Sequence, residues 1–291
     1  MLRATVKLCC GIAHDHLRGP PGLKTAAAAA RRNDVRGLLL RGSQRLPSKI
    51  PRYLQRLMGK DAAACPEPEG DLRAGRFSGV DLCYVKQGER ALQRALRILQ
   101  QHDGWRAETT PDAGAAVWSA ALPGLGRVFR AEAVLSAPVG RLHRELFEDV
   151  ERMPEWYPAL SRVQVLRRAG PDTLLTHEVT ARSAADLVGP RDFVSVRHRG
   201  ATGAAVYLVG TAGGGERLPP PPAGCVRAES RLSCMILQPL AGDPSRTRLT
   251  WLLSMDLKGW IPASVVNRVL PQSQADFIGR LRQRLAAAAH P

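Results

Sequence analysis

The sequence predicts an α+β fold in which a curved antiparallel sheet wraps around a long C-terminal helix. Strand-like segments follow one another from residue 116 to residue 257. Apolar residues recur at helical spacing before these segments, over residues 80–99, and after them, from Pro262 onward. Many short strands between an early helix and a long terminal helix favour one layered domain, and its expected bounds are residues 80–288.

The first ordered element is expected to be an amphipathic helix that starts at Val80 and ends before Asp103-Gly104. Its spaced apolar residues are Leu82, Val85, Leu92, Leu96 and Leu99. A second helix is expected to open at Pro138, because proline is tolerated in a first helical turn. The apolar stripe of this second helix consists of Leu142, Leu146, Phe147, Val150 and Met153.

The expected strands cover residues 116–122, 128–135, 162–168, 173–181, 191–198, 204–211, 225–231, 233–240 and 248–257. The last strand has the clearest alternation of side chains. One of its faces carries Trp251, Leu253, Met255 and Leu257, and the other carries Leu252, Ser254 and Asp256.

The C-terminal helix is expected to start at Pro262 and to bury one apolar stripe. The stripe consists of Val266, Leu270, Phe277, Leu281 and Leu285, and the solvent side carries Arg280, Arg282 and Arg284. Pro271 lies inside this helix, where proline removes a hydrogen bond at a cost of roughly 3 kcal/mol. A kink or a break near Leu270 is therefore expected.

The excess of positive charge belongs mainly to the first 60 residues. They hold 13 Lys and Arg against two acidic residues, a net of +11, and residues 61–291 hold the other 29 basic and 24 acidic residues, a net of +5. The leader is rich in Arg and Ala and has short amphipathic pieces, which is typical of a mitochondrial targeting presequence. Residues 1–62 are predicted to be this presequence and residues 63–79 a flexible linker. The charge distribution disfavours a nucleic-acid partner.

The sequence shows no motif for catalysis, a cofactor or a metal. It contains no GxxxxGK[ST], no HExxH, no GxSxG and no CxxC pair, so no enzymatic activity, cofactor or metal site is expected. His177 lies beside Glu178, but adjacent strand residues point to opposite faces and cannot share one site without a bulge. We expect His177 to be a surface or inter-strand residue.

Glu178 and Arg197 interrupt two neighbouring apolar strands, and the break at 187–190 can bring these strands side by side. The pair could be a cross-strand ion pair on a solvated face, worth about 0.5 kcal/mol. It could instead be a polar anchor inside an apolar chamber. Alternation does not decide between the two, because Glu178 shares its face with Leu174 and Thr176, and Arg197 shares its face with Phe193.

The segments THEVTARSAADLVGPRDFVSVR and LTWLLSMDLKGW resemble the START lipid-transfer family, and the basic leader resembles its sterol-carrying mitochondrial members. The resemblance implies a helix-grip fold with an internal tunnel for one sterol. It implies that Glu178 and Arg197 are the buried acid–arginine pair at the end of the tunnel, that Arg191 is structural, and that Leu208 and Leu257 line the wall. Ser230 stands where mammalian members carry histidine, and its hydroxyl could still bind the cargo.

The same resemblance implies a cholesterol-binding lipid-transfer protein that moves cholesterol from the outer to the inner mitochondrial membrane and supplies steroid hormone synthesis. The stripe of the C-terminal helix would then be a lid over the sterol, opening at the outer membrane. The expected partners are cholesterol, that membrane surface and the import machinery, and the expected state is a monomer. The alternative is a carrier of another lipid such as phosphatidylcholine, which would need a phosphate-binding cluster. An enzyme would need a nucleophile or paired acids near Arg197.

Overall fold

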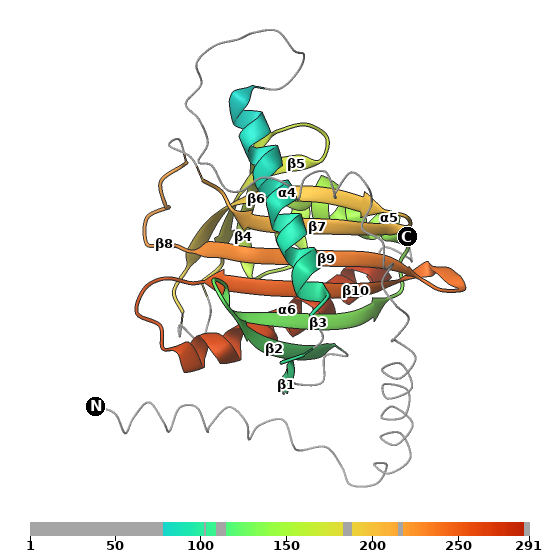
Figure 1. Cartoon of the computed structure of the whole chain (residues 1–291). Helices are drawn as coiled ribbons and strands as arrows, with labels where there is room; N and C mark the ends of the chain where they lie inside the picture. The colour runs from blue at the N-terminus through green and yellow to red at the C-terminus, as the bar shows by residue number, and fades with distance from the viewer. Residues whose placement is uncertain (1–77, 102, 109–114, 183–187, 215–217, 288–291) are drawn as a thin grey trace. The chain divides into compact units, whose positions relative to one another are not determined.

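The computed structural model describes residues 78–101, 103–108, 115–182, 188–214 and 218–287. A 10-stranded sheet has the order β1-β2-β3-β10-β9-β7-β6-β5-β4, and β8 pairs with β6 beside this path (Figure 1). Neighbours along the path are antiparallel, and β8 is parallel to β6. The predicted antiparallel sheet is confirmed. The predicted presequence, residues 1–62, and most of the predicted linker lie outside the described residues.

The strands of the sheet range in length from the two residues of β8 to the 14 residues of β10. The strands are β1 Arg106–Glu108, β2 Ala116–Leu122, β3 Gly126–Leu135, β4 Leu160–Arg168, β5 Thr173–Thr180, β6 Arg191–Thr202, β7 Ala205–Ala212, β8 Val226–Arg227, β9 Glu229–Leu240 and β10 Asp243–Asp256. Alternation predicted most of these strands to within a few residues. The expected strand 225–231 is wrong, because β8 has only two residues and β9 already begins at Glu229.

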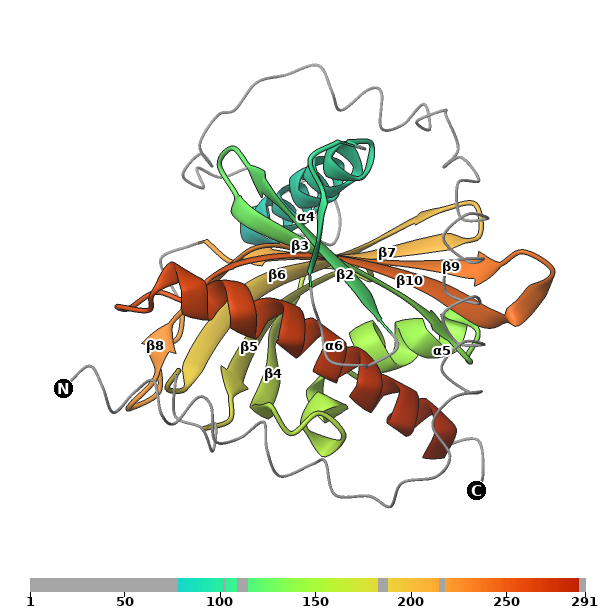
Figure 2. The same ribbon diagram turned by 90° about the horizontal axis from the view of Figure 1, so that it is seen from below.

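Two long helices cover opposite faces of the sheet, as Figure 2 shows: α4 (Gly79–Leu99) and α6 (Ala263–Ala287). The α4 face buries one cluster with Leu92, Leu99 and residues of β7, β9 and β10. The α6 face buries a larger cluster that joins α6 to strands at both sides of the sheet and to α5 (Val139–His143), η1 (Arg144–Glu148) and η2 (Val150–Glu155). The cargo chamber predicted from the family resemblance would lie on this α6 face, and its presence stays a prediction.

Helix α4 is closed at its start by a capping box. The Ser78 side chain accepts a hydrogen bond from the Asp81 backbone, and the Asp81 carboxylate accepts one from the Ser78 backbone. Arg167 on β4 also donates to the Asp81 carboxylate and, with the Ser78 bonds, lowers the pKa of Asp81 to about 2. This ion pair fastens the first turn of α4 to an edge strand.

The helix predicted at Pro138 exists, but it is divided into α5, a single π turn (η1) and a 3-10 segment (η2). All five residues of its predicted stripe are buried, so the stripe was correct although the backbone is not one regular helix.

Helix α6 runs without interruption through Pro271, so the predicted break near Leu270 is wrong. Pro271 and Leu270 are both buried, and packing of this side of the helix against the sheet holds the backbone helical in spite of the missing hydrogen bond. In the part of the chain that the structure describes, no helix is long and apolar enough to cross a membrane.

Candidate functional site

The candidate site is the space between the α6 face of the sheet and helix α6. Apolar side chains from β3, β4, β5, β6, β7 and β10 meet the stripe of α6 there. Leu270, Phe277, Leu281 and Leu285 are buried in this cluster, and Val266 packs against it at the start of the helix. The predicted stripe of the lid is thus the inward side of α6.

The ion pair of Glu178 and Arg197 forms between β5 and β6. The Arg197 Nε and Nη2 atoms both donate to Glu178 Oε1, at 3.0 and 2.9 Å. The Thr176 hydroxyl donates to the same oxygen at 3.0 Å. Thr176 was missed as a partner, although its position two residues before Glu178 on the same face was the signal for it.

The strand register places this pair on the α6 face. Glu178 is paired across the sheet with Phe193, and Arg197 with Leu174; both neighbours belong to the cluster under α6. The Glu178 side chain is 16% exposed and the Arg197 side chain 21%. The pair is therefore half-buried among apolar groups. Its burial is intermediate between the two alternatives that the sequence left open, a solvated ion pair and a fully buried anchor. Its role toward a cargo stays a prediction.

Leu208, Ser230 and Leu257 come from three places on the same side of the domain. Leu208 on β7 and Leu257 after β10 are buried members of the cluster under α6. Ser230 is buried on β9 and pairs with Met255, which packs against the same cluster, next to a register shift between the strands. The fold brings all three residues to the α6 face of the sheet, and their contact with cargo stays a prediction.

Phe277 is the centre of an aromatic group that joins α6 to β10 and to the two residues that follow η2. Its ring lies 5.3 Å from that of Trp156, 4.9 Å from that of Tyr157 and 5.1 Å from that of Trp251. Burial raises the pKa of Tyr157 to about 12, so its phenol stays neutral. These contacts pack the middle of α6 against β10 and the residues that follow η2.

Polar contacts fasten the C-terminal half of α6. Arg141 on α5 donates to the Leu285 carbonyl at 3.0 Å, and Arg284 pairs with Glu145 at 3.3 Å. Arg282 donates to the Val134 carbonyl at 3.3 Å, and burial lowers its pKa. The prediction of a solvent side with three arginines is therefore wrong for Arg282 and Arg284, because both are half-buried and bind neighbouring elements.

The start of α6 is held differently, through the turn that leaves β10. Arg191 is buried and donates to the carbonyls of Leu257, Gly189 and Lys258, at 3.2, 2.6 and 3.4 Å. Lys258 and Gly259 both have positive φ, so this turn is sharp. Arg191 therefore links the β5–β6 connection to the turn before α6, which is the structural role predicted for it.

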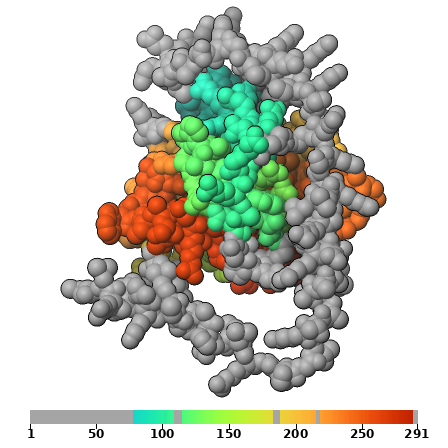
Figure 3. Space-filling view, turned by 60° about the horizontal axis from the view of Figure 1, so that its bottom comes forward, coloured from blue at the N-terminus to red at the C-terminus, as the bar shows by residue number. Residues whose placement is uncertain are grey.

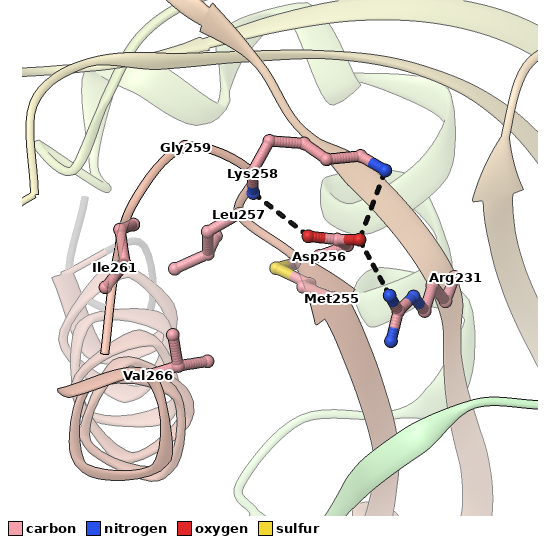
Figure 4. Close-up of a pocket in the computed structure, with 8 residues that line it drawn as sticks. All are labelled: Arg231, Met255, Asp256, Leu257, Lys258, Gly259, Ile261 and Val266. Atoms are coloured by element: carbon pink, nitrogen blue, oxygen red, sulfur yellow. Dashed lines mark hydrogen bonds and ion pairs between the residues drawn. The ribbon is translucent and has the colours of Figure 1, made fainter. Parts of the chain in front are cut away.

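A small cavity of about 100 Å³ lies under this turn (Figure 4). It is lined by Arg231, Met255, Asp256, Leu257, Lys258, Gly259, Ile261 and Val266. Ligand pockets usually measure about 300–1,000 Å³, so this cavity is too small for a lipid without movement of α6.

The start of α6, orange-red in Figure 3, lies at the molecular surface beside the green strands β2 and β3.

His177 is buried and is not a surface residue, so that half of its prediction is wrong; the inter-strand half is right. Its Nε2 atom lies 2.9 Å from Asp192 Oδ2, and Arg227 donates to the same oxygen at 2.7 Å. Burial alone would raise the pKa of Asp192, but the hydrogen bonds from Arg227 and His177 lower it below its ordinary value. Arg227 also donates to the Pro219 carbonyl, so this network fastens the loop before β8.

A START domain model matches residues 86–290 of the chain. The steroidogenic acute regulatory protein, mitochondrial, of Gallus gallus is 43% identical over 291 residues and covers 99% of each chain. The proteins of the same name from Homo sapiens and Danio rerio are 42% and 40% identical, over 100% and 99% of this chain and 98% and 96% of theirs.

Solved structures give the same fold at lower identity. Human StAR-related lipid transfer protein 5 is 19% identical with a TM-score of 0.66, covering 72% of this chain and 100% of its own. Human STARD10 is 21% identical with a TM-score of 0.55, covering 68% and 81%. The family model matches more than half of the chain, and the curated relatives match it along nearly its whole length. The chain belongs to the START domain family and, within it, to the group of the steroidogenic acute regulatory proteins.

Proposed function

We propose that this chain is a mitochondrial lipid-transfer protein that binds cholesterol and moves it from the outer to the inner mitochondrial membrane, where it supplies steroid synthesis. Membership of the START domain family, together with full-length relatives named as mitochondrial steroidogenic acute regulatory proteins, supports this function. The functional class is that of a carrier, and the human relative of known structure is named a lipid transfer protein.

The observation that carries the proposal is the ion pair of Glu178 and Arg197 on the apolar α6 face. Burying a sterol contributes on the order of 0.8 kcal/mol for each CH₂-sized unit, which the leucine-rich chamber can provide. Its one hydroxyl would cost roughly 1–3 kcal/mol if it lost its partners in water. The half-buried pair offers donors and an acceptor to that hydroxyl, directly or through water, and Leu208, Ser230 and Leu257 would contact the ring system.

Cargo exchange requires the lid to open, and the turn before α6 suits contact with a membrane. Trp260 in this turn is 98% exposed, next to Lys258 and the start of the amphipathic helix. Tryptophan favours the interface between water and lipid, and a cationic neighbour favours anionic headgroups. We propose that this end of α6 meets the outer mitochondrial membrane. The basic segment 1–62 would bring the chain there through the import machinery.

The test is native mass spectrometry of the full chain after incubation with liposomes that contain both cholesterol and phosphatidylcholine. We expect a complex with the mass of one sterol, and loss of that complex in Arg197→Leu with the domain still folded. A bound phospholipid in place of the sterol would contradict the proposal and identify a carrier of another lipid. Transfer of labelled sterol between liposomes, with and without the chain, measures the activity itself.

A further inference from the structure

Gln274 is a polar side chain at the centre of the lid's inward side, and it is fully buried. Its Nε2 atom donates to the Trp251 carbonyl on β10 at 3.2 Å. Its Oε1 atom is buried and has no hydrogen-bond partner among the described residues. Buried polar side chains are nearly always hydrogen-bonded, so an acceptor left open at this place needs an explanation.

The orientation of the Gln274 amide follows from its neighbour. Turning the amide over would put Oε1 against the Trp251 carbonyl, and two acceptors repel each other. The Nε2 group therefore stays on Trp251, and Oε1 remains the open acceptor.

A complementary donor lies in the same part of the chamber. The indole Nε1 of Trp156 is also buried and has no partner in the described part of the chain. Trp156 and Trp251 both contact the Phe277 ring, at 5.3 and 5.1 Å between ring centroids. Gln274 precedes Phe277 by three residues on α6 and binds Trp251, so the two residues that carry the open acceptor and the open donor are both neighbours of Phe277.

This place is distinct from the anchor of Glu178 and Arg197. In the sheet, strands β7 and β9 separate β6, which carries Arg197, from β10, to which Gln274 binds. Three steps between neighbouring strands correspond to roughly 14 Å along the sheet. Glu178 Oε1 already accepts three hydrogen bonds, whereas Gln274 Oε1 and Trp156 Nε1 are open.

We infer that Gln274 and Trp156 form a second polar subsite, on the lid, for a hydroxyl at the far end of a sterol cargo. The inference rests on the proposed sterol-carrier function and extends its substrate class to side-chain-hydroxylated sterols. A hydroxyl is the neutral group that can donate to Oε1 and accept from the indole N–H at once, whereas a ketone can only accept. Because Gln274 lies on α6, a cargo that reaches it also joins the lid to the chamber.

The test compares binding of cholesterol, of 25-hydroxycholesterol and of the corresponding side-chain ketone to the full chain. We expect the diol to bind about tenfold more tightly than cholesterol, as one or two added neutral hydrogen bonds allow, and more tightly than the ketone. Gln274→Met keeps the length and apolar stem of the side chain and should abolish the preference. Trp156→Phe should reduce it, and Gln272→Met, on the same helix with its amide bound to Asp276, is the matched control.

The ratio of the two sterol affinities does not depend on the fraction of folded protein, so a destabilised variant still gives an answer. If the native chain binds neither sterol, the proposed function fails, and the inference fails with it. If it binds cholesterol and the diol equally, the inference alone is overturned, and ordered water satisfies the two atoms. A preference that survives in Gln274→Met would also overturn the assignment.

Discussion

Replacing Arg197 by leucine tests whether the ion pair under α6 is a buried anchor. The change removes two charge-assisted hydrogen bonds from Glu178 Oε1, at 2.9 and 3.0 Å, and leaves only the bond from Thr176. A hydrogen bond to a charged group contributes about 1.5–3 kcal/mol, and removing one partner of a buried pair costs about 3–5 kcal/mol. Because the Glu178 side chain is 16% exposed, water compensates in part. We expect a loss of about 2–3 kcal/mol.

The assay is urea unfolding of Arg197→Leu, Glu178→Leu and the double variant, followed by circular dichroism. The double variant should be more stable than Arg197→Leu, because it leaves no unpaired carboxylate on the apolar face. An Arg197→Leu change of less than about 0.5 kcal/mol would refute the reasoning, since exposed ion pairs contribute only about 0–1 kcal/mol. The pair would then be a solvated surface bridge.

Three other changes test the lid and its supports, and a fourth tests the capping box of α4. Phe277→Ala removes a ring that is 4% exposed and should lower the free energy of unfolding by about 3–5 kcal/mol. It should also reduce sterol transfer between liposomes, and unchanged transfer would show that transfer does not depend on this part of the lid. Pro271→Ala restores a helical hydrogen bond and should slow hydrogen exchange in the first half of α6, whereas equal rates would show that packing already compensates. Arg191→Lys should speed exchange in residues 257–262 only, and uniform acceleration would indicate global destabilisation instead. The folded pKa of Asp81, about 2, is below its unfolded value, so its contribution is present above about pH 4 and is lost as the pH falls toward 2. Asp81→Asn should abolish that part of the acid sensitivity in unfolding experiments from pH 5 to 2, and an unaltered pH profile would contradict it.

Local patterns predicted the elements well because each depends on near neighbours in the chain. The alternation in β10 separates Trp251 and Leu253 from Leu252 as the structure does, and Phe277 and Leu281 lie on the buried side of α6. Periodicity carries this information because a side chain's face follows from its position along a strand or a helix.

The candidate site was less accessible to this reasoning. Gln274 became a candidate only through its contact with Trp251, a residue that the fold brings near. Thr176, in contrast, lies two residues before Glu178 on the same strand, where local spacing already pointed to it. For His177 the surface was one of two predicted locations. Its burial could not be read from the local sequence, because it depends on Asp192, fifteen residues away on the next strand. Such partners follow from strand register, which no local pattern specifies.

The sequence by itself determined the α+β class, the apolar side of the terminal helix and the presence of an acid and an arginine on neighbouring strands. Only the tertiary structure decided which side of the sheet Glu178 and Arg197 occupy, because both strands carry mixed faces and α6 covers just one of them. It also decided that α6 continues through Pro271, since packing over the whole helix outweighs one lost hydrogen bond. Burial and partnership are properties of the assembled layers, whereas periodicity is a property of the chain.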